Sequence, residues 1–352
     1  MGPALIPPAS SPKDIIYHVR KLLGTSSAGP ASQFLRPLVQ ALASVADIER
    51  YPDVFLDTSA TYTPHGKAVS MITAAQCADD IERSRVFMQG IYNAIGQKLD
   101  TGEEVRVLYA GTGPLGMLVI PLLPLFDAKR VQVTLLDIHQ ESLDKLQRII
   151  QHLNIEAHIT AQECTDATTW RPPDGRQFDI IVSETMKHLL QQEPQVQIFT
   201  HLEQFLAPGG TLIPREVRLS ASLVDSSDPL RKIPSERPLG TFFLLNQKTA
   251  RQLRAGEAAA LTCELPVPLH DGGHPHLKLA TQIQVYGEHR LGNNQSQLTL
   301  PRFKYNVNLS PGSKLRCHYQ QGQSPDWQFT VDSEAVSYQN TLPQTFPSHP
   351  HP

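Results

Sequence analysis

The sequence predicts an α/β protein whose doubly wound parallel sheet is followed by a β-rich region. Three observations support this fold class. Apolar runs of strand length alternate with helical segments from about Val105 to Ile213, several of these runs end at a glycine or an acid, and short alternating segments with turn residues fill the remainder. In sheets of this type, ligands bind at the carboxyl ends of the strands. We therefore expect the functional residues at those ends.

The first predicted strand begins at Val105 and runs into the glycine-rich turn Gly111-Thr-Gly-Pro-Leu-Gly116. Because glycine has no Cβ, Gly111 and Gly113 permit the close approach of a ligand. We expect an apolar helix after this turn, beginning with unpaired N–H groups that favour an anionic or polar ligand. Such a turn also occurs for packing alone, so it indicates a site only together with further signals.

Acids end the next two predicted strands. The second strand, residues 131–137, ends at Asp137 and is followed by an amphipathic helix, and an acid in this place accepts both hydroxyls of a ribose. The third strand-like segment ends at Asp166, beside Ala167, where we expect an adenine edge to bind. Together with the glycine-rich turn, these residues predict a nucleoside site.

Two glutamates follow the fourth predicted strand, residues 178–182. Glu184 lies where the strand stops and Glu193 returns after a short loop, so both carboxylates are expected at one pocket. Paired carboxylates suit a cationic substrate. Taken alone, the pair is better explained by Glu193 as a solvated loop acid and Glu184 as a charge at a helix start, and only the context upstream favours a shared site.

With these residues in view, the segment resembles a class I S-adenosylmethionine (SAM) methyltransferase with a Rossmann-like fold, specifically the protein arginine methyltransferase family with its double-glutamate loop. The turn after Tyr109, the Thr165-Asp-Ala segment and Asp179-Ile-Ile-Val-Ser-Glu are similar to the symmetric-dimethylating branch. The resemblance spans roughly residues 75–225. It implies SAM as cofactor and Glu184 and Glu193 as the catalytic pair that grips a guanidinium. The implied cofactor-binding residues are Arg83, Gly111, Gly113, Asp137, Asp166, Ala167 and Glu184, with Arg85 as second choice to Arg83 for the cofactor carboxylate.

Several positions depart from the family pattern. Tyr109 stands where the family commonly has an acid, and Lys187 and His188 stand where it usually has a glycine after methionine. No Thr-His-Trp motif occurs in the carboxyl-terminal third. We expect Lys187, His188 and Tyr62 as substrate-binding residues; in the alternative, Lys187 and His188 point to solvent. A segment around Phe55 and Tyr62 is expected to form a lid.

Residues 215–339 are expected to form an antiparallel β-barrel or sandwich domain for substrate binding or dimerisation. His270, His274 and His276 resemble a metal cluster, but the glycines between them and the absence of a nearby cysteine or acid partner favour a turn, so no metal is expected. The predicted strands comprise residues 217–224, 258–265, 277–286, 297–300, 303–309, 314–319 and 327–331.

The amino-terminal residues 1–65 are expected to be helical, with apolar faces that either cap the central domain or pair with another subunit. Residues 66–214 form the predicted cofactor-binding domain. Residues 1–12 and the tail 340–352 are rich in proline and expected to be disordered.

Composition limits the classes of function. The chain has 352 residues, 40% of them hydrophobic, a net charge of −3 and no basic run, which argues against nucleic acid as a partner. Four scattered cysteines, no signal peptide and no membrane-spanning run predict a cytoplasmic protein without membrane contact. The apolar run after Gly116 is interrupted by Pro121 and Pro124 and is expected to be a buried helix.

The sequence therefore predicts a SAM-dependent N-methyltransferase, expected as a homodimer, that acts on a guanidino nitrogen of free L-arginine or a small arginine-derived metabolite in natural-product biosynthesis. The alternatives are arginine in a peptide or protein, another small amine, and a non-catalytic SAM-binding scaffold.

Overall fold

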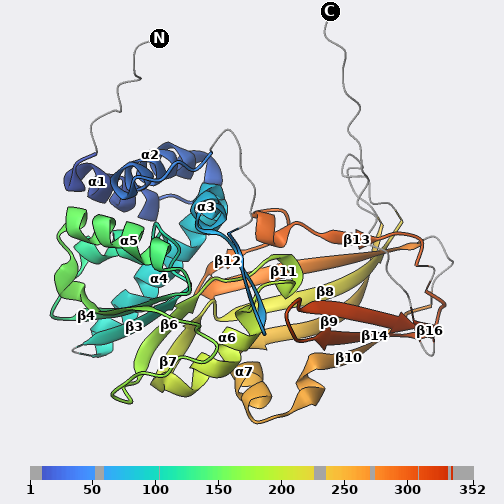
Figure 1. Ribbon diagram of the computed structural model, residues 1–352. Coiled ribbons are helices and arrows are strands. Elements are labelled where there is room, and N and C mark those ends of the chain that lie inside the picture. Colours follow the sequence, from blue (N-terminus) through green and yellow to red (C-terminus); the bar gives the residue numbers. More distant parts are fainter. Residues whose placement is uncertain are drawn as a thin grey trace, which may run out of the picture.

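The computed structural model describes residues 10–51, 59–102, 104–225, 235–269, 274–307, 309–331 and 334–335. A central parallel sheet is flanked by helices on one side of the molecule, and antiparallel sheets extend to the other side (Figure 1). Two amino-terminal helices lie over the helical layer of the central sheet (Figure 1). None of the described helices is both long and apolar enough to cross a membrane.

The central sheet is parallel throughout, with the strand order β5-β4-β3-β6-β7. In the register of the three central strands, Ala110 pairs with Leu136 on one side and with Ser183 on the other. The glycine-rich turn and the acids that follow these strands therefore leave the sheet at the same edge. The strands are β3 (Val105–Ala110), β4 (Val131–Asp137), β5 (Ile159–Cys164), β6 (Phe178–Ser183) and β7 (Leu206–Ile213).

The element after the glycine-rich turn differs from the prediction. A 3-10 helix, η2 (Ile120–Leu125), replaces the expected α-helix. Pro121 and Pro124 lie within it and lack the N–H groups that an α-helical ladder needs, although its apolar side chains are buried as expected. The remaining helices of this part are α3 (Met71–Gln76), α4 (Ile81–Thr101), α5 (Gln140–Leu153) and α6 (Gln195–Leu202).

The amino-terminal helices α1 (Pro12–Leu23) and α2 (Ala28–Ala46) pack against each other, and α2 packs on α4 and α5. The sequence left open whether these helices cap the central domain or pair with another subunit, and in the structure they cap the central domain. Helix α1 begins at Pro12 with a capping box from Ser11, so the predicted disorder does not extend to Pro12. Residues 1–9 and 340–352 lie outside the described residues.

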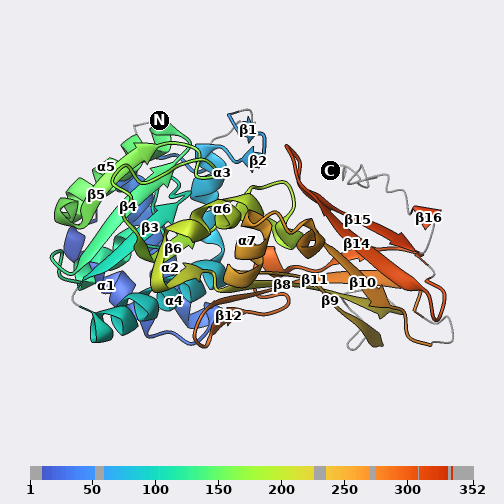
Figure 2. The same cartoon turned by 90° about the horizontal axis from the view of Figure 1, so that it is seen from below.

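Two antiparallel sheets form the β-rich part (Figure 2). Aromatic side chains pack between them, with Phe243 of one sheet stacked on Tyr319 of the other. The predicted strand 297–300 is wrong, since Gln297–Thr299 form a 3-10 turn capped by Ser296. The predicted strand 258–265 is confirmed only in its second half, because Ala258–Leu261 form a 3-10 turn and the strand begins at Thr262. One sheet contains β8 (Glu216–Val224), β9 (Glu236–Asn246), β11 (His276–Tyr286), β12 (His289–Leu291) and β13 (Arg302–Lys304); the other contains β10 (Thr262–Pro266), β14 (Lys314–Gln320), β15 (Asp326–Val331) and β16 (Glu334–Ala335); α7 (Gln247–Arg254) follows β9.

A short hairpin, β1 (Thr61–Thr63) and β2 (Gly66–Ala68), leaves the helical part and extends beside the β-rich part (Figure 1). The hairpin contacts the loop between β6 and α6: the amide of Lys67 donates to the carbonyl of Gln192 at 2.7 Å. The hairpin thus forms a wall of the region where the strand ends meet.

Candidate functional site

A cavity of about 1250 Å³, including its open mouth, lies at the carboxyl ends of β3, β4 and β6. Its wall is largely apolar and carries a few charged groups, as is usual for small-molecule sites. Tyr62, Lys187 and His188 do not line it. Eight predicted residues are brought together around it: Arg83, Gly111, Gly113, Asp137, Asp166, Ala167, Glu184 and Glu193.

The glycine-rich turn is held by hydrogen bonds to β4. The amide of Gly111 donates to the Leu136 carbonyl at 2.8 Å, and that of Gly113 donates to Asp137 Oδ2 at 2.8 Å. Both glycine amides are therefore engaged within the protein. Gly111 is required for a different reason: its φ is +75°, and a Cβ there would lie 2.3 Å from Cγ2 of Thr185, the residue after Glu184.

Asp137 is buried at the end of β4. It accepts the amides of Gly113 and His139 on separate oxygens, and burial raises the pKa of its carboxyl while these hydrogen bonds lower it. Oδ2 also accepts from Thr112 Oγ1 at 3.3 Å, whereas Oδ1 retains a second lone pair for a ribose hydroxyl, so the expected ribose contacts stay a prediction. Asp166 similarly accepts from the amide of Thr168 at 2.8 Å beside buried Ala167.

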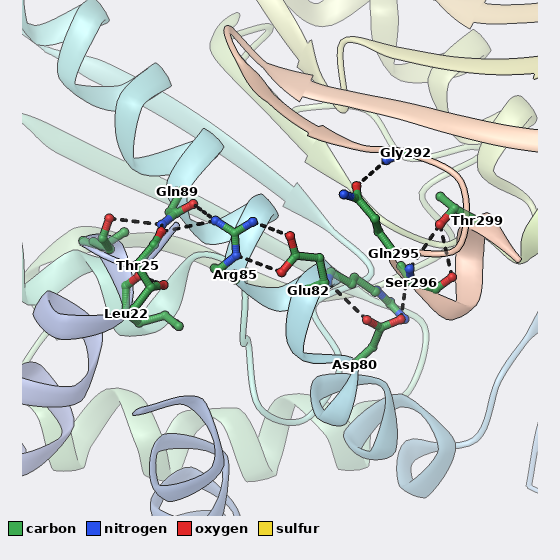
Figure 3. Close-up of polar contacts among 12 residues, drawn as sticks. Leu22, Thr25, Asp80, Glu82, Arg85, Gln89, Gly292, Gln295, Ser296 and Thr299 are labelled. Atoms are coloured by element: carbon green, nitrogen blue, oxygen red, sulfur yellow. Dashed lines mark hydrogen bonds and ion pairs between the residues drawn. The ribbon is translucent and has the colours of Figure 1, made fainter. Parts of the chain in front are cut away.

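Arg83 and Arg85 have different roles. The Arg83 side chain lines the cavity and forms an ion pair with Glu184. Arg85 points away, toward the amino-terminal helices, where it binds Glu82, the Gln89 side chain at 2.8 Å and the Thr25 carbonyl at 3.3 Å (Figure 3). The structure thus places Arg83, and not Arg85, at the cavity.

Asp80 fixes the start of the helix that carries Arg83. One of its oxygens accepts the backbone amide of Arg83 at 3.1 Å, and the other accepts Ser296 Oγ at 2.7 Å and the Gln297 amide at 2.8 Å (Figure 3). Asp80 therefore joins α4 to a turn of the β-rich part. Sequence reasoning missed this role, although an aspartate directly before a helix is a typical N-cap.

The Glu184 carboxylate is buried, with only 3% of its side chain exposed. Its Oε2 pairs with Arg83, whereas its Oε1 has no hydrogen-bond partner among the described residues. A buried carboxylate oxygen without a donor is costly, so we expect a bound group or an ordered water to donate to it. Glu193 lines the same cavity from the far end of the loop.

The loop between the two glutamates contains unusual backbone. Leu189, Leu190 and Gln192 have φ values of 56°, 57° and 65°, which L residues rarely adopt. Each such residue costs on the order of 1–3 kcal/mol and persists only where its surroundings fix it. The loop is consequently held in one conformation by contacts outside itself.

The predicted substrate residues Lys187 and His188 lie on the outer side of this loop. Lys187 is exposed and donates to the side chain of Gln192 at 2.8 Å, while His188 Nδ1 lies 3.0 Å from a guanidinium nitrogen of Arg302. Tyr62 is 70% exposed on the hairpin. None of the three lines the cavity, so their contacts to a substrate stay a prediction, and Phe55 lies outside the described residues.

Desolvation, together with the nearby charges of Arg302 and Lys187, lowers the pKa of His188 from 6.5 to about 4. The unfolded chain therefore takes up a proton here as pH falls through 6.5, while the folded chain does so only near pH 4. We expect the free energy of unfolding to decrease between these values. Chemical denaturation of wild type and His188→Asn over pH 4–7 measures this effect. The free energy of unfolding of the variant should depend less steeply on pH than that of wild type, and equal pH dependences would contradict the expectation.

The carboxyl-terminal histidines do not form a cluster in the part of the chain that the structure describes. His274 Nε2 lies 2.8 Å from Ser235 Oγ, and His276 Nδ1 accepts the amide of Asn306 at 3.1 Å. Among the described residues no group of three or more His, Cys, Asp or Glu is arranged to hold a metal ion. His270 lies outside the described residues.

Comparisons with known proteins agree with this geometry. Residues 107–210 match a family model described as a methyltransferase domain. The chain is similar to a solved structure of the Trypanosoma brucei PRMT1 enzyme-prozyme heterotetrameric complex with AdoHcy, with 14% sequence identity, a TM-score of 0.50, and coverage of 74% of this chain and 92% of that chain. At this identity the likeness establishes the fold alone. The search of curated proteins returned no match.

The chain thus contains a methyltransferase domain within a Rossmann-like fold that has amino-terminal helices and carboxyl-terminal antiparallel sheets, as predicted from the sequence. A methyltransferase domain implies SAM as the cofactor. The cavity fits this cofactor, since apolar residues such as Leu115 and Met117 face it together with the acids Asp137 and Asp166 and the cation Arg83.

Proposed function

We propose that this protein transfers a methyl group from SAM to a guanidino nitrogen, with free L-arginine or a small arginine-derived metabolite of natural-product biosynthesis as the acceptor. The observation that carries the proposal is the buried Glu184 carboxylate, which already binds the guanidinium of Arg83 and has one oxygen without a donor among the residues that the structure describes. Glu193 supplies a second carboxylate at the same cavity.

The chemistry explains why two acids serve this reaction. A guanidinium has a pKa above about 12 and arrives protonated, with its charge spread over three poor nucleophiles. Glu184 and Glu193 would hold it by charge-assisted hydrogen bonds and draw charge away from the reacting nitrogen. The two carboxylates would also offset the repulsion between the guanidinium and the cationic sulfonium of SAM. Holding the nitrogen in line with the methyl group lowers the entropic part of the barrier.

SAM, when bound, supplies an electrophilic methyl group. We assign Arg83 to its carboxylate, Asp137 to its ribose, and Asp166 with Ala167 to its adenine. Arg83 then has two anions to bind, the cofactor carboxylate and Glu184. If its guanidinium moved from Glu184 to the cofactor carboxylate, Glu184 would become available to the acceptor.

Arg83→Ala tests the cofactor assignment. Losing a charge-assisted contact costs about 1.5–3 kcal/mol, so we expect the Kd for SAM to rise by roughly 10- to 100-fold. Isothermal titration calorimetry measures this, with Arg106→Ala as the control, because Arg106 forms only an exposed pair with Glu104. Equal Kd values for SAM in the two variants would show that Arg83 does not bind the cofactor.

The missing Thr-His-Trp motif supports free arginine as the acceptor. Lys187 and His188 lie outside the cavity and do not contribute to this assignment. A peptide or protein arginine and another small amine are the alternatives in the same reaction class. For an ammonium acceptor, a glutamate would also have to remove a proton before transfer.

Incubation with methyl-labelled SAM and separate pools of free arginine, arginine peptides and simple amines distinguishes these acceptors by mass spectrometry. Label in free arginine supports the proposal, and label only in peptides or amines replaces the acceptor. Cofactor binding without label in any pool would favour the scaffold alternative.

We also propose a homodimer, by analogy with the resembled family. Because α1 and α2 bury their apolar faces on the central domain, a partner would have to contact other surfaces. Light scattering at several protein concentrations measures the assembly.

A further inference from the structure

We propose that Tyr319 and Trp327, two buried residues of the β-rich part, are positioning residues for the loop that carries Glu193. This inference rests on the proposed function, because it gives that loop a catalytic task. Both residues lie far from the loop in sequence, on β14 and β15.

The two aromatic side chains bind consecutive carbonyl groups of the loop. Tyr319 Oη donates to the Leu190 carbonyl at 2.7 Å, and Trp327 Nε1 donates to the Leu189 carbonyl at 3.0 Å. Their rings are 2% and 3% exposed and lie 5.0 Å apart, between centroids. Phe243 packs on both rings, which leaves their polar ends little freedom to move.

The bound carbonyls belong to the residues with unfavourable backbone. Leu189 and Leu190 both have positive φ, and neither side chain favours that conformation. Two further backbone groups of the loop bond to the β-rich part: Thr281 Oγ1 accepts the Leu189 amide at 3.1 Å, and the Pro325 carbonyl accepts the Gln192 amide at 2.7 Å. These four hydrogen bonds to the loop backbone, all from the β-rich part, therefore impose the path of the loop.

This path determines where Glu193 lies. Glu193 follows Gln192 directly, and its own amide donates to the Gln191 carbonyl at 2.8 Å. Glu193 also lines a small groove on the outer side of the cavity, whose wall includes Tyr319. A loop that relaxed toward ordinary φ values would carry the Glu193 carboxylate with it, whereas the cofactor residues on β3, β4 and α4 would remain in place.

Tyr319→Phe removes one hydroxyl and retains the ring. We expect kcat for methyl transfer to fall by roughly 10- to 100-fold, the effect of a displacement of about 1 Å at a reacting group, while the KM for SAM changes by less than about twofold. Tyr286→Phe is the matched control, since Tyr286 Oη donates to Gln97 at an exposed position distant from the loop. Its kinetic constants should equal those of wild type.

Hydrogen exchange provides a readout that does not depend on the acceptor. The amides of residues 189–193 should exchange faster in Tyr319→Phe than in wild type or Tyr286→Phe. If Tyr319→Phe does not fold, Thr281→Val removes another hydrogen bond of the same set and should give the same results. Unchanged kcat and unchanged exchange would overturn the inference. Methyl transfer to no guanidine by wild type would defeat the proposed function, while the exchange experiment would still decide whether Tyr319 holds the loop.

Discussion

Glu184→Gln is expected to lower the rate of methyl transfer by about 10²- to 10³-fold, the usual loss when one group that stabilises developing charge is removed. The substitution keeps the shape of the side chain and replaces a buried carboxylate by an amide. Arg83 loses its protein partner but retains the cofactor carboxylate as an alternative. The Kd for SAM should therefore change by less than about tenfold.

Glu203→Gln is the control for this variant. Glu203 is also buried and binds two arginines, Arg251 and Arg254, but it lies outside the cavity. We expect it to lower the thermal unfolding midpoint and leave the rate intact. Similar rates for Glu184→Gln and wild type, measured with saturating SAM, would show that Glu184 is not catalytic.

Gly66→Ala is expected to displace the second half of the double-glutamate loop. Gly66 has φ +147°, and a Cβ there would lie 2.8 Å from the backbone nitrogen of Pro194 and 2.9 Å from the carbonyl carbon of Glu193. Because both neighbours are backbone atoms, the loop or the hairpin must shift. We expect a stability loss of about 1–3 kcal/mol and a kcat lower by roughly 10- to 100-fold.

Gly96→Ala separates this effect from a general response to added methyl groups. Gly96 lies in α4, and its added Cβ would contact nothing within 4 Å. Alanine should stabilise the helix by about 0.5–1 kcal/mol without changing the rate. Steady-state kinetics and denaturant unfolding of both variants provide the comparison, and equal behaviour of the two would contradict the close contact between hairpin and loop.

The sheet and the cavity residues follow from the sequence for a simple reason. Parallel strands are buried on both faces, so they appear as apolar runs, and the residues just after them must meet at one edge. That rule was sufficient to place Gly111, Asp137, Asp166 and Glu184 together. The family resemblance favoured Arg83 for the cofactor carboxylate but did not exclude Arg85. The partners of Arg85, which are Glu82, Gln89 and Thr25, become evident only in three dimensions.

The errors lie where long-range contacts overrule local signals. No glycine marks the positive φ values at Leu189 and Leu190, so the turn that carries Lys187 and His188 away from the cavity could not be predicted from the loop sequence. The forces that impose it come from Tyr319, Trp327 and Thr281, which are distant in the chain. The same applies to Asp80, whose bond to Ser296 joins residues separated by 216 positions.

We propose that this protein methylates a guanidino nitrogen held by Glu184 and Glu193. Fragmentation mass spectrometry of the product formed from methyl-labelled SAM by wild type and by Glu184→Gln tests this proposal. We expect a labelled fragment that contains the guanidino group for wild type, and at least about 100-fold less of it for the variant. A label on an amino nitrogen or another atom, or equal amounts of product from the two proteins, would contradict it.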